Sequence, residues 1–188
     1  MKKIGILGED PYDTSSIQLL LEKKYSSKVQ FCRLLKGTKG SQLDNAKVIG
    51  ALKIEIEKHK CEAVIIMRDL DGLISQTDLL NQRQKWFDRL NTAGQHIFLL
   101  NIWELEAMIF ADIDVFNKKF KTTVKGDRNP MFINDPKGEL ISATYKTKRK
   151  FGVSDCPEIF AELNLDKLIT KCKFLNNFVQ EFDTRLAK

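Results

Sequence analysis

The stretch Glu62-Ala-Val-Ile-Ile-Met67 runs directly into Arg68-Asp69-Leu70-Asp71-Gly72. The first part has the length and apolar content of a buried β-strand, and the second part ends that strand with two carboxylates one residue apart. Residues i and i+2 of a strand point to the same side, so we expect Asp69 and Asp71 to lie together. Two like charges placed there repel each other unless a cation or a shared proton relieves them. Mg²⁺, which binds carboxylate, water and phosphate oxygens, fits this arrangement.

Three further apolar segments predict strands before and after this one. They are Lys3-Ile-Gly-Ile-Leu7, Lys28-Val-Gln-Phe-Cys-Arg-Leu34 and His96-Ile-Phe-Leu-Leu-Asn101. Between and after them, helical spacing of apolar residues predicts helices over 17–25, 41–58, 77–90 and 102–111, the first of them capped by Asp13-Thr-Ser-Ser16. Short strands that alternate with helices predict an α/β protein, with a mostly parallel sheet of about four strands and helices on both faces.

The pattern changes after residue 116. Segment 117–155 is polar, basic and weakly periodic, which predicts a basic loop or insertion, and 156–188 returns to helical spacing. We therefore divide the chain into an α/β core over 1–116, the basic insertion over 117–155, and C-terminal helices over 156–188 that pack on the core. Between 117 and 150 there are ten Lys and Arg against three Asp and Glu, although the whole chain carries a net charge of only +6. Such a local excess indicates either a surface that faces a polyanion or a solvated lysine-rich loop.

Composition narrows the class of protein. In 188 residues no apolar run approaches the roughly 20 residues that a membrane helix needs. The first nine residues turn acidic too early for a signal peptide, so we expect a cytoplasmic protein without a membrane partner. The four cysteines are scattered, so neither a zinc knuckle nor a disulfide framework is indicated.

Acidic residues follow three of the predicted strands. In an open α/β sheet, ligands gather outside the carboxyl ends of the strands, so these side chains should share one edge. Carboxylates that converge there can supply the metal ligands and the base that phosphoryl transfer requires. Each acid taken alone has a simpler interpretation as a helix cap or a solvent-facing helix residue. The set consists of Glu9, Asp69, Asp71, Glu104 and Glu106.

These residues resemble a known family. Gly8-Glu9 and Asp69-Leu70-Asp71-Gly72 look like the motifs of the Toprim domain, which type IA and type II topoisomerases, bacterial primases and OLD-type nucleases share. The stretches Trp103-Glu104-Leu105-Glu106-Ala107 and Asp135-Pro136-Lys137 resemble a group of small stand-alone Toprim-like proteins. The resemblance implies a Rossmann-like sheet, Glu9 as general acid/base, and Mg²⁺ or Mn²⁺ held by Asp69 and Asp71 with Glu104 and Glu106. One difference is Asp10, where the family commonly has glycine.

The resemblance implies a metal-dependent nuclease, in phage defence or DNA repair. Nucleic acid would then be the partner, bound by Lys39, Lys146, Lys148, Arg149 and Lys150. Lys39 has a simpler interpretation as a surface lysine in a glycine-rich turn. OLD-type enzymes carry an ATPase, and because this chain has no Gly-x-x-x-x-Gly-Lys-Ser/Thr motif, any ATPase would be a separate polypeptide. Two alternatives stay open: a non-catalytic module of the same fold that binds metal, nucleotide or nucleic acid beside a partner protein, and a receiver-like phosphoacceptor domain.

Overall fold

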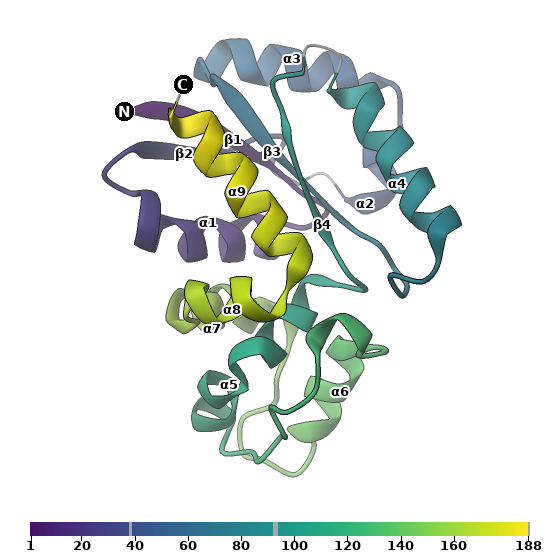
Figure 1. Ribbon diagram of the computed structural model, residues 1–188, viewed down its shortest axis with the longest axis vertical. Helices are drawn as coiled ribbons and strands as arrows, with labels where there is room; N and C mark the ends of the chain where they lie inside the picture. Colours follow the sequence, from purple (N-terminus) through teal and green to yellow (C-terminus); the bar gives the residue numbers. More distant parts are fainter. Residues whose placement is uncertain (38, 92–93, 188) are drawn as a thin grey trace.

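The computed structural model describes residues 1–37, 39–91 and 94–187, and its centre is a parallel sheet (Figure 1). The strands are β1 (Lys2–Leu7), β2 (Val29–Arg33), β3 (Ala63–Asp69) and β4 (Ile97–Asn101). All pairings are parallel, in the order β2-β1-β3-β4, with Leu7 opposite Ile66 and Asp69 opposite Asn101. The predicted α/β class with a four-stranded parallel sheet is confirmed, because each strand is an apolar run separated from the next by helix.

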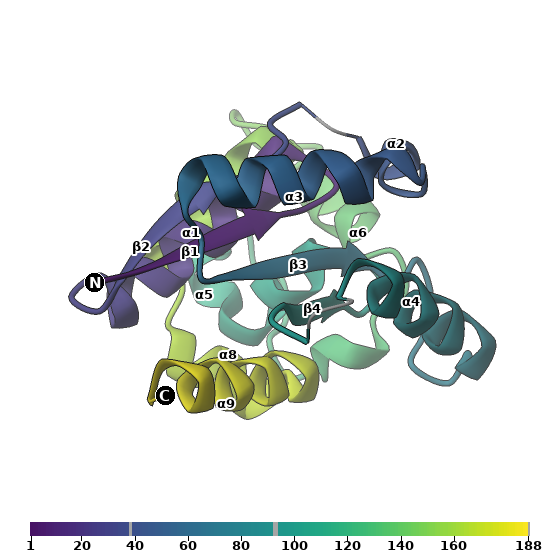
Figure 2. The ribbon, with the colours of Figure 1, turned by 90° about the horizontal axis from the view of Figure 1, so that it is seen from above.

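Alternate residues of each strand build two apolar layers, one on each face of the sheet. Along β3, Val64 and Ile66 pack in one layer with helices α2 (Gly40–Leu43), α3 (Lys47–His59) and α4 (Thr77–Leu90). Ile65 and Met67 pack in the other layer with α1 (Pro11–Tyr25) and α9 (Lys173–Ala187). Figure 2 shows α3 on one side of the sheet and α9 on the opposite side.

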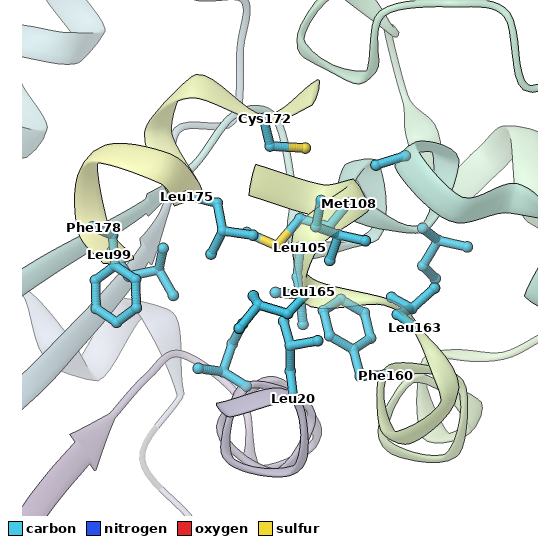
Figure 3. Close-up of a cluster of buried hydrophobic side chains, with 14 of the residues drawn as sticks. Leu20, Leu99, Leu105, Met108, Phe160, Leu163, Leu165, Cys172, Leu175 and Phe178 are labelled. Carbon is cyan, nitrogen blue, oxygen red and sulfur yellow. The ribbon is translucent and has the colours of Figure 1, made fainter. Parts of the chain in front are cut away.

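The larger layer continues beyond the sheet into a set of short helices. They are η1 (Leu105–Asp112), α5 (Ile113–Phe120), η2 (Pro130–Phe132), α6 (Pro136–Ala143), η3 (Val153–Asp155), α7 (Cys156–Glu162) and α8 (Leu165–Lys171). Figure 3 shows how Leu105 and Met108 of η1 meet Phe160 and Leu175 in one buried cluster.

Segment 117–155 is therefore not the loop that its composition predicts. It contains α6 and the two short turns η2 and η3, and Met131, Leu140 and Phe151 in it belong to the main core. The buried apolar residues of this segment are spaced too irregularly for a periodic signal, and others, such as Phe132 and Tyr145, are exposed.

Two predicted helices also differ from the observed ones. The helix expected over 41–58 is interrupted between α2 and α3. At the interruption, Arg68 binds the carboxylate of Asp44. The side chain of Asn45 then accepts a hydrogen bond from the amide of Lys47, where α3 begins. The helix expected over 102–111 begins only at Leu105, because Trp103 exchanges backbone hydrogen bonds with Asp71 and Gly72 and prolongs the pairing beyond β4.

Among the described residues, no helix combines the length and the apolar character needed to cross a membrane.

Candidate metal centre

The carboxyl ends of β1, β3 and β4 form one edge of the sheet, and polar side chains follow each of them. Asp69 is the last residue of β3, and its Oδ1 accepts a 2.8 Å hydrogen bond from Nδ2 of Asn101, its register partner on β4. Glu9 lies two residues beyond β1, and its Oε1 accepts the Asp69 amide at 3.1 Å. The predicted convergence of Glu9 and Asp69 is therefore present in the structure.

Glu9 is further anchored by a buried arginine on the other face of the sheet. Arg68 Nε lies 2.9 Å from Glu9 Oε1, and its two terminal nitrogens bind both oxygens of Asp44 at 3.0 and 3.1 Å. The guanidinium also stacks 4.7 Å from the ring centroid of Trp86. Burial raises the pKa of Glu9, and the positive charge of Arg68 opposes that shift. Gly40 completes the enclosure, because a Cβ there would lie 2.2 Å from Glu9 Oε2.

Asp13 joins this site from the first turn of α1. The sequence predicts Asp13 as part of the helix cap, but the cap is Asp10, whose Oδ1 accepts the Tyr12 amide at 2.7 Å, with Pro11 at the first helical position. Asp13 is half-buried, and burial followed by the negative charges of Glu106, Asp10 and Glu9 raises its pKa to about 8. One feature of the sequence indicates a role for Asp13 in the site. It lies in the first turn of the helix that follows Glu9, and that turn lies over the same edge of the sheet.

Glu106 reaches the site from η1. It is only 3% exposed, and burial raises its pKa although the charge of Lys137 opposes that shift. Burial also raises the pKa of Asp69 well above its usual value, and the charges of Asp13, Glu9 and Glu106 act in the same direction. The structure thus brings four carboxyl groups from β1, α1, β3 and η1 into one electrostatic cluster, which we call the acidic edge: Glu9, Asp13, Asp69 and Glu106.

Glu104 lies beside the acidic edge and is neutralised by a lysine from α6. Lys137 Nζ is 2.6 Å from Glu104 Oε1, while Glu104 Oε2 is buried without a hydrogen-bond partner among the described residues. Burial alone would lower the pKa of Lys137, but the bond to Glu104 and the charge of Glu106 raise it instead. The Lys137 side chain is presented by the cap of α6, where Asp135 Oδ1 accepts the Gly138 amide at 2.9 Å.

Asp71 does not extend beside Asp69, which corrects the expectation drawn from strand alternation. Its φ of 58° ends the extended backbone, and its carboxylate forms a 2.5 Å ion pair with Arg83 of α4. The Asp71 side chain is 62% exposed, so it lies at the rim rather than within the acidic edge. Its negative charge still contributes to the raised pKa of Glu9.

The predicted nucleic-acid contacts divide into two kinds. Lys39, Lys146 and Lys148 are exposed, and Lys39 precedes the Gly40 that contacts Glu9. Arg149 instead pairs with Asp155 and Glu158, and Lys150 donates to the carbonyl oxygens of Thr144 and Tyr145. Arg149 and Lys150 therefore already form hydrogen bonds with other residues of the chain, which leaves fewer of their N–H groups for a nucleic acid.

The donor set of the acidic edge consists of carboxylate oxygens, which suits a hard cation such as Mg²⁺ or Mn²⁺. The raised pKa values of Asp13, Asp69 and Glu106 and the unpaired Glu104 Oε2 are what a cation would relieve. Within residues 1–37, 39–91 and 94–187, no three Asp, Glu, His or Cys side chains are already arranged as a metal-binding group.

Together these features define an α/β protein with an acidic site at the carboxyl edge of a parallel sheet. The chain belongs to the family described as a domain of unknown function (DUF4276), which matches residues 9–183. No curated protein and no solved structure matches it. The matched region begins at Glu9 and contains every residue of the acidic edge.

Proposed function

We propose that this protein is a Mg²⁺- or Mn²⁺-dependent phosphodiesterase of the Toprim type that acts on nucleic acid. The observation that carries the proposal is the convergence of four carboxyl groups at one sheet edge, those of Glu9, Asp13, Asp69 and Glu106. Burial is the largest cause that raises the pKa of each of them, and the pKa of Asp13 rises to about 8. Burying several like charges without a bound cation is unfavourable, and such perturbed groups concentrate at functional sites.

In this proposal Asp13, Asp69 and Glu106 would hold the metal ion. The metal ion would polarise the phosphoryl oxygens and lower the pKa of water. Glu9 is the general base, because Arg68 and the Asp69 amide fix its orientation and its raised pKa makes it a stronger base than an ordinary glutamate. Lys137 would leave Glu104 to neutralise charge on the phosphate, which frees Glu104 as a further metal ligand.

The test is a cleavage assay with purified protein and Mg²⁺ or Mn²⁺. Supercoiled plasmid, single-stranded DNA and RNA serve as substrates. Asp69→Asn and Glu9→Gln should each abolish cleavage, whereas Asp78→Asn, an exposed acid in the first turn of α4, should leave it unchanged. Cleavage that survives Asp69→Asn would overturn the assignment.

A second function, a non-catalytic binding module beside a partner protein, is favoured by one observation. Lys137 and Arg83 already neutralise Glu104 and Asp71, so two of the acids predicted as ligands are engaged without a metal ion. In that case Mn²⁺ should raise the melting temperature of the wild-type protein but not of Asp69→Asn, and no substrate should be cut.

A further inference from the structure

A cavity of about 120 Å³ lies next to the acidic edge, between the β1–α1 loop and the end of β2. Its lining includes Gly8 and Asp10 of the β1–α1 loop, Thr14 of α1, and Arg33 and Lys36 from the end of β2 and the loop that follows. Since Asp10 directly follows Glu9, a group bound in this cavity would be a close neighbour of the acidic edge. The site described above uses none of the basic residues that line this cavity.

Two cations border the cavity, and neither has a carboxylate partner within residues 1–37, 39–91 and 94–187. Arg33 is the last residue of β2 and half-buried, and its Nη1 donates to Ser15 Oγ of α1, which fixes the guanidinium against the first turns of that helix. Among the described residues neither Arg33 nor Lys36 has an acidic oxygen within 4.0 Å. Asp10 is the one acid in the lining, and its Oδ1 already accepts the Tyr12 amide.

These features suit an anion that accepts several hydrogen bonds at once. The guanidinium of Arg33 has further N–H groups besides the one directed at Ser15, and arginine presents them in a planar fork that matches phosphate oxygens. Lys36 adds an exposed ammonium group at the mouth of the cavity. A carboxylate of this chain would be the ordinary partner of a half-buried arginine, and none occupies that position among the residues that the structure describes.

We propose that Arg33 and Lys36 form a phosphate subsite that binds a nucleic-acid phosphodiester beside the one to be cleaved. The nature of the ligand rests on the proposed function, whereas the subsite itself rests on the cavity and on two cations that have no acidic partner in the part of the chain that the structure describes. A phosphate seated there would orient the strand so that its neighbouring phosphate faces Glu9 and Asp69. It would also explain how a sheet edge with so many acids attracts a polyanion at all.

The subsite is tested by binding rather than by cleavage. Fluorescence anisotropy is measured with short labelled single-stranded DNA, RNA and duplex DNA in Ca²⁺, and the integrity of each strand is checked afterwards. Arg33→Gln should weaken binding of the preferred strand about tenfold or more, because a charge-assisted, forked contact to phosphate is lost, and Lys36→Gln about threefold, because its ammonium group is exposed and screened by solvent. Lys53→Gln, the same charge change on the exposed side of α3, should leave binding unchanged.

Competition identifies the group that is bound. Inorganic phosphate and a nucleoside 5′-monophosphate should displace the strand from the wild-type protein but not alter the residual binding of Arg33→Gln. Arg33→Lys keeps the positive charge but loses the planar guanidinium, so its affinity for the strand should lie between those of the wild type and Arg33→Gln. It replaces Arg33→Gln in the experiment if Arg33→Gln does not fold.

Two outcomes overturn the subsite: wild-type affinity in Arg33→Gln or Arg33→Lys, and no binding of any strand by the wild-type protein. Binding that depends on Arg33 in a protein that never cleaves would instead overturn the proposed nuclease and leave the subsite standing.

Discussion

Arg68 is the residue on which the position of Glu9 depends. It is 5% exposed, and its charge is balanced by two carboxylates, Glu9 on one side and Asp44 on the other. A buried charge that loses its partners keeps the full cost of desolvation, so removing either side of such a pair is more damaging than replacing both. Arg68 and Asp69 are neighbours at the end of β3, so their side chains point to opposite faces of the sheet. Arg68 can therefore bind Glu9 and Asp44 without displacing Asp69 from the acidic edge.

We expect Arg68→Met to lower the free energy of unfolding by about 3 kcal/mol, because Glu9 and Asp44 lose their counter-charge. Urea unfolding followed by circular dichroism measures the change. Glu9→Gln in the Arg68→Met background should cost less than in the wild type, since the uncharged amide no longer needs the guanidinium. Strictly additive free energies in this double-mutant cycle would show that the Arg68–Glu9 ion pair has no energetic coupling.

Asp13 makes the stability of the metal-free protein depend on pH. Its pKa rises from an ordinary value of 3.8 to about 8 in the folded chain, so the folded state binds this proton more tightly than the unfolded state. Its contribution to stability is therefore complete below pH 4 and is lost as the pH rises toward 8. The groups that face it are Glu9 and Asp10 beside it, Asp69 on β3, Glu106 on η1 and Lys137 on α6.

In EDTA, the unfolding free energy should thus fall by roughly 3–4 kcal/mol more between pH 5 and pH 8 in the wild type than in Asp13→Asn. Asp78→Asn serves as the control, because it replaces an exposed acid and should keep the wild-type slope. Mn²⁺ should reduce the fall, since a bound cation stabilises the ionised carboxylates. Parallel pH profiles for wild type and Asp13→Asn would contradict the burial and charge repulsion inferred at this position.

At the scale of elements, the short helix α6 determines where Lys137 lies. Asp135 adopts φ 49° and its carboxylate caps the helix, and Gly138 leaves room for that carboxylate, which a Cβ at this position would displace. Pro136 occupies the first helical position, where its missing N–H costs nothing. The motif Asp-Pro-Lys-Gly thus begins α6 and places the ammonium group of Lys137 beside Glu104.

Asp135→Ala should cost about 1 kcal/mol and lower the melting temperature by about 2–4 °C. It should also reduce the stabilisation by Mn²⁺, because a frayed α6 no longer places Lys137 beside Glu104. Asp135→Asn keeps both the cap and a side chain suited to positive φ, so it should behave like the wild type. Asn164→Ala removes the cap of α8 instead and should cost similar stability without changing the response to Mn²⁺.

The elements of the sheet could be predicted from the sequence because each strand is a short apolar run between helices. The same topology predicts that Glu9 and Asp69 meet, since parallel strands share one carboxyl edge. Asp13 could not be assigned in this way, because its direction depends on how α1 docks on the sheet. The turn of Asp71 toward Arg83 depends likewise on a single positive φ, and the Lys137–Glu104 pair joins residues 33 positions apart.

At the scale of the whole molecule, the excess positive charge is smaller at the surface than the sequence suggests. Arg128 pairs with Glu139, Lys119 with Glu158 and Glu162, and Arg149 with Asp155 and Glu158. These pairs tie the basic segment to the helices around it. Exposed cations without such a partner in the described chain, such as Lys146 and Lys148, remain to attract a polyanion.

The salt dependence of nucleic-acid binding should therefore follow the unpaired lysines. For a single strand, the slope of log K against log salt changes by about 0.7 for each phosphate contact, so replacing Lys146 and Lys148 together by Gln should reduce it by about 1.4. Arg149→Gln carries half of that charge change but removes a surface ion pair within the chain, so it should alter the slope little and stability only slightly. Anisotropy titrations at several salt concentrations measure the slopes. A larger loss of slope in Arg149→Gln than in the double lysine variant would mean that Arg149 leaves Asp155 and Glu158 to bind phosphate.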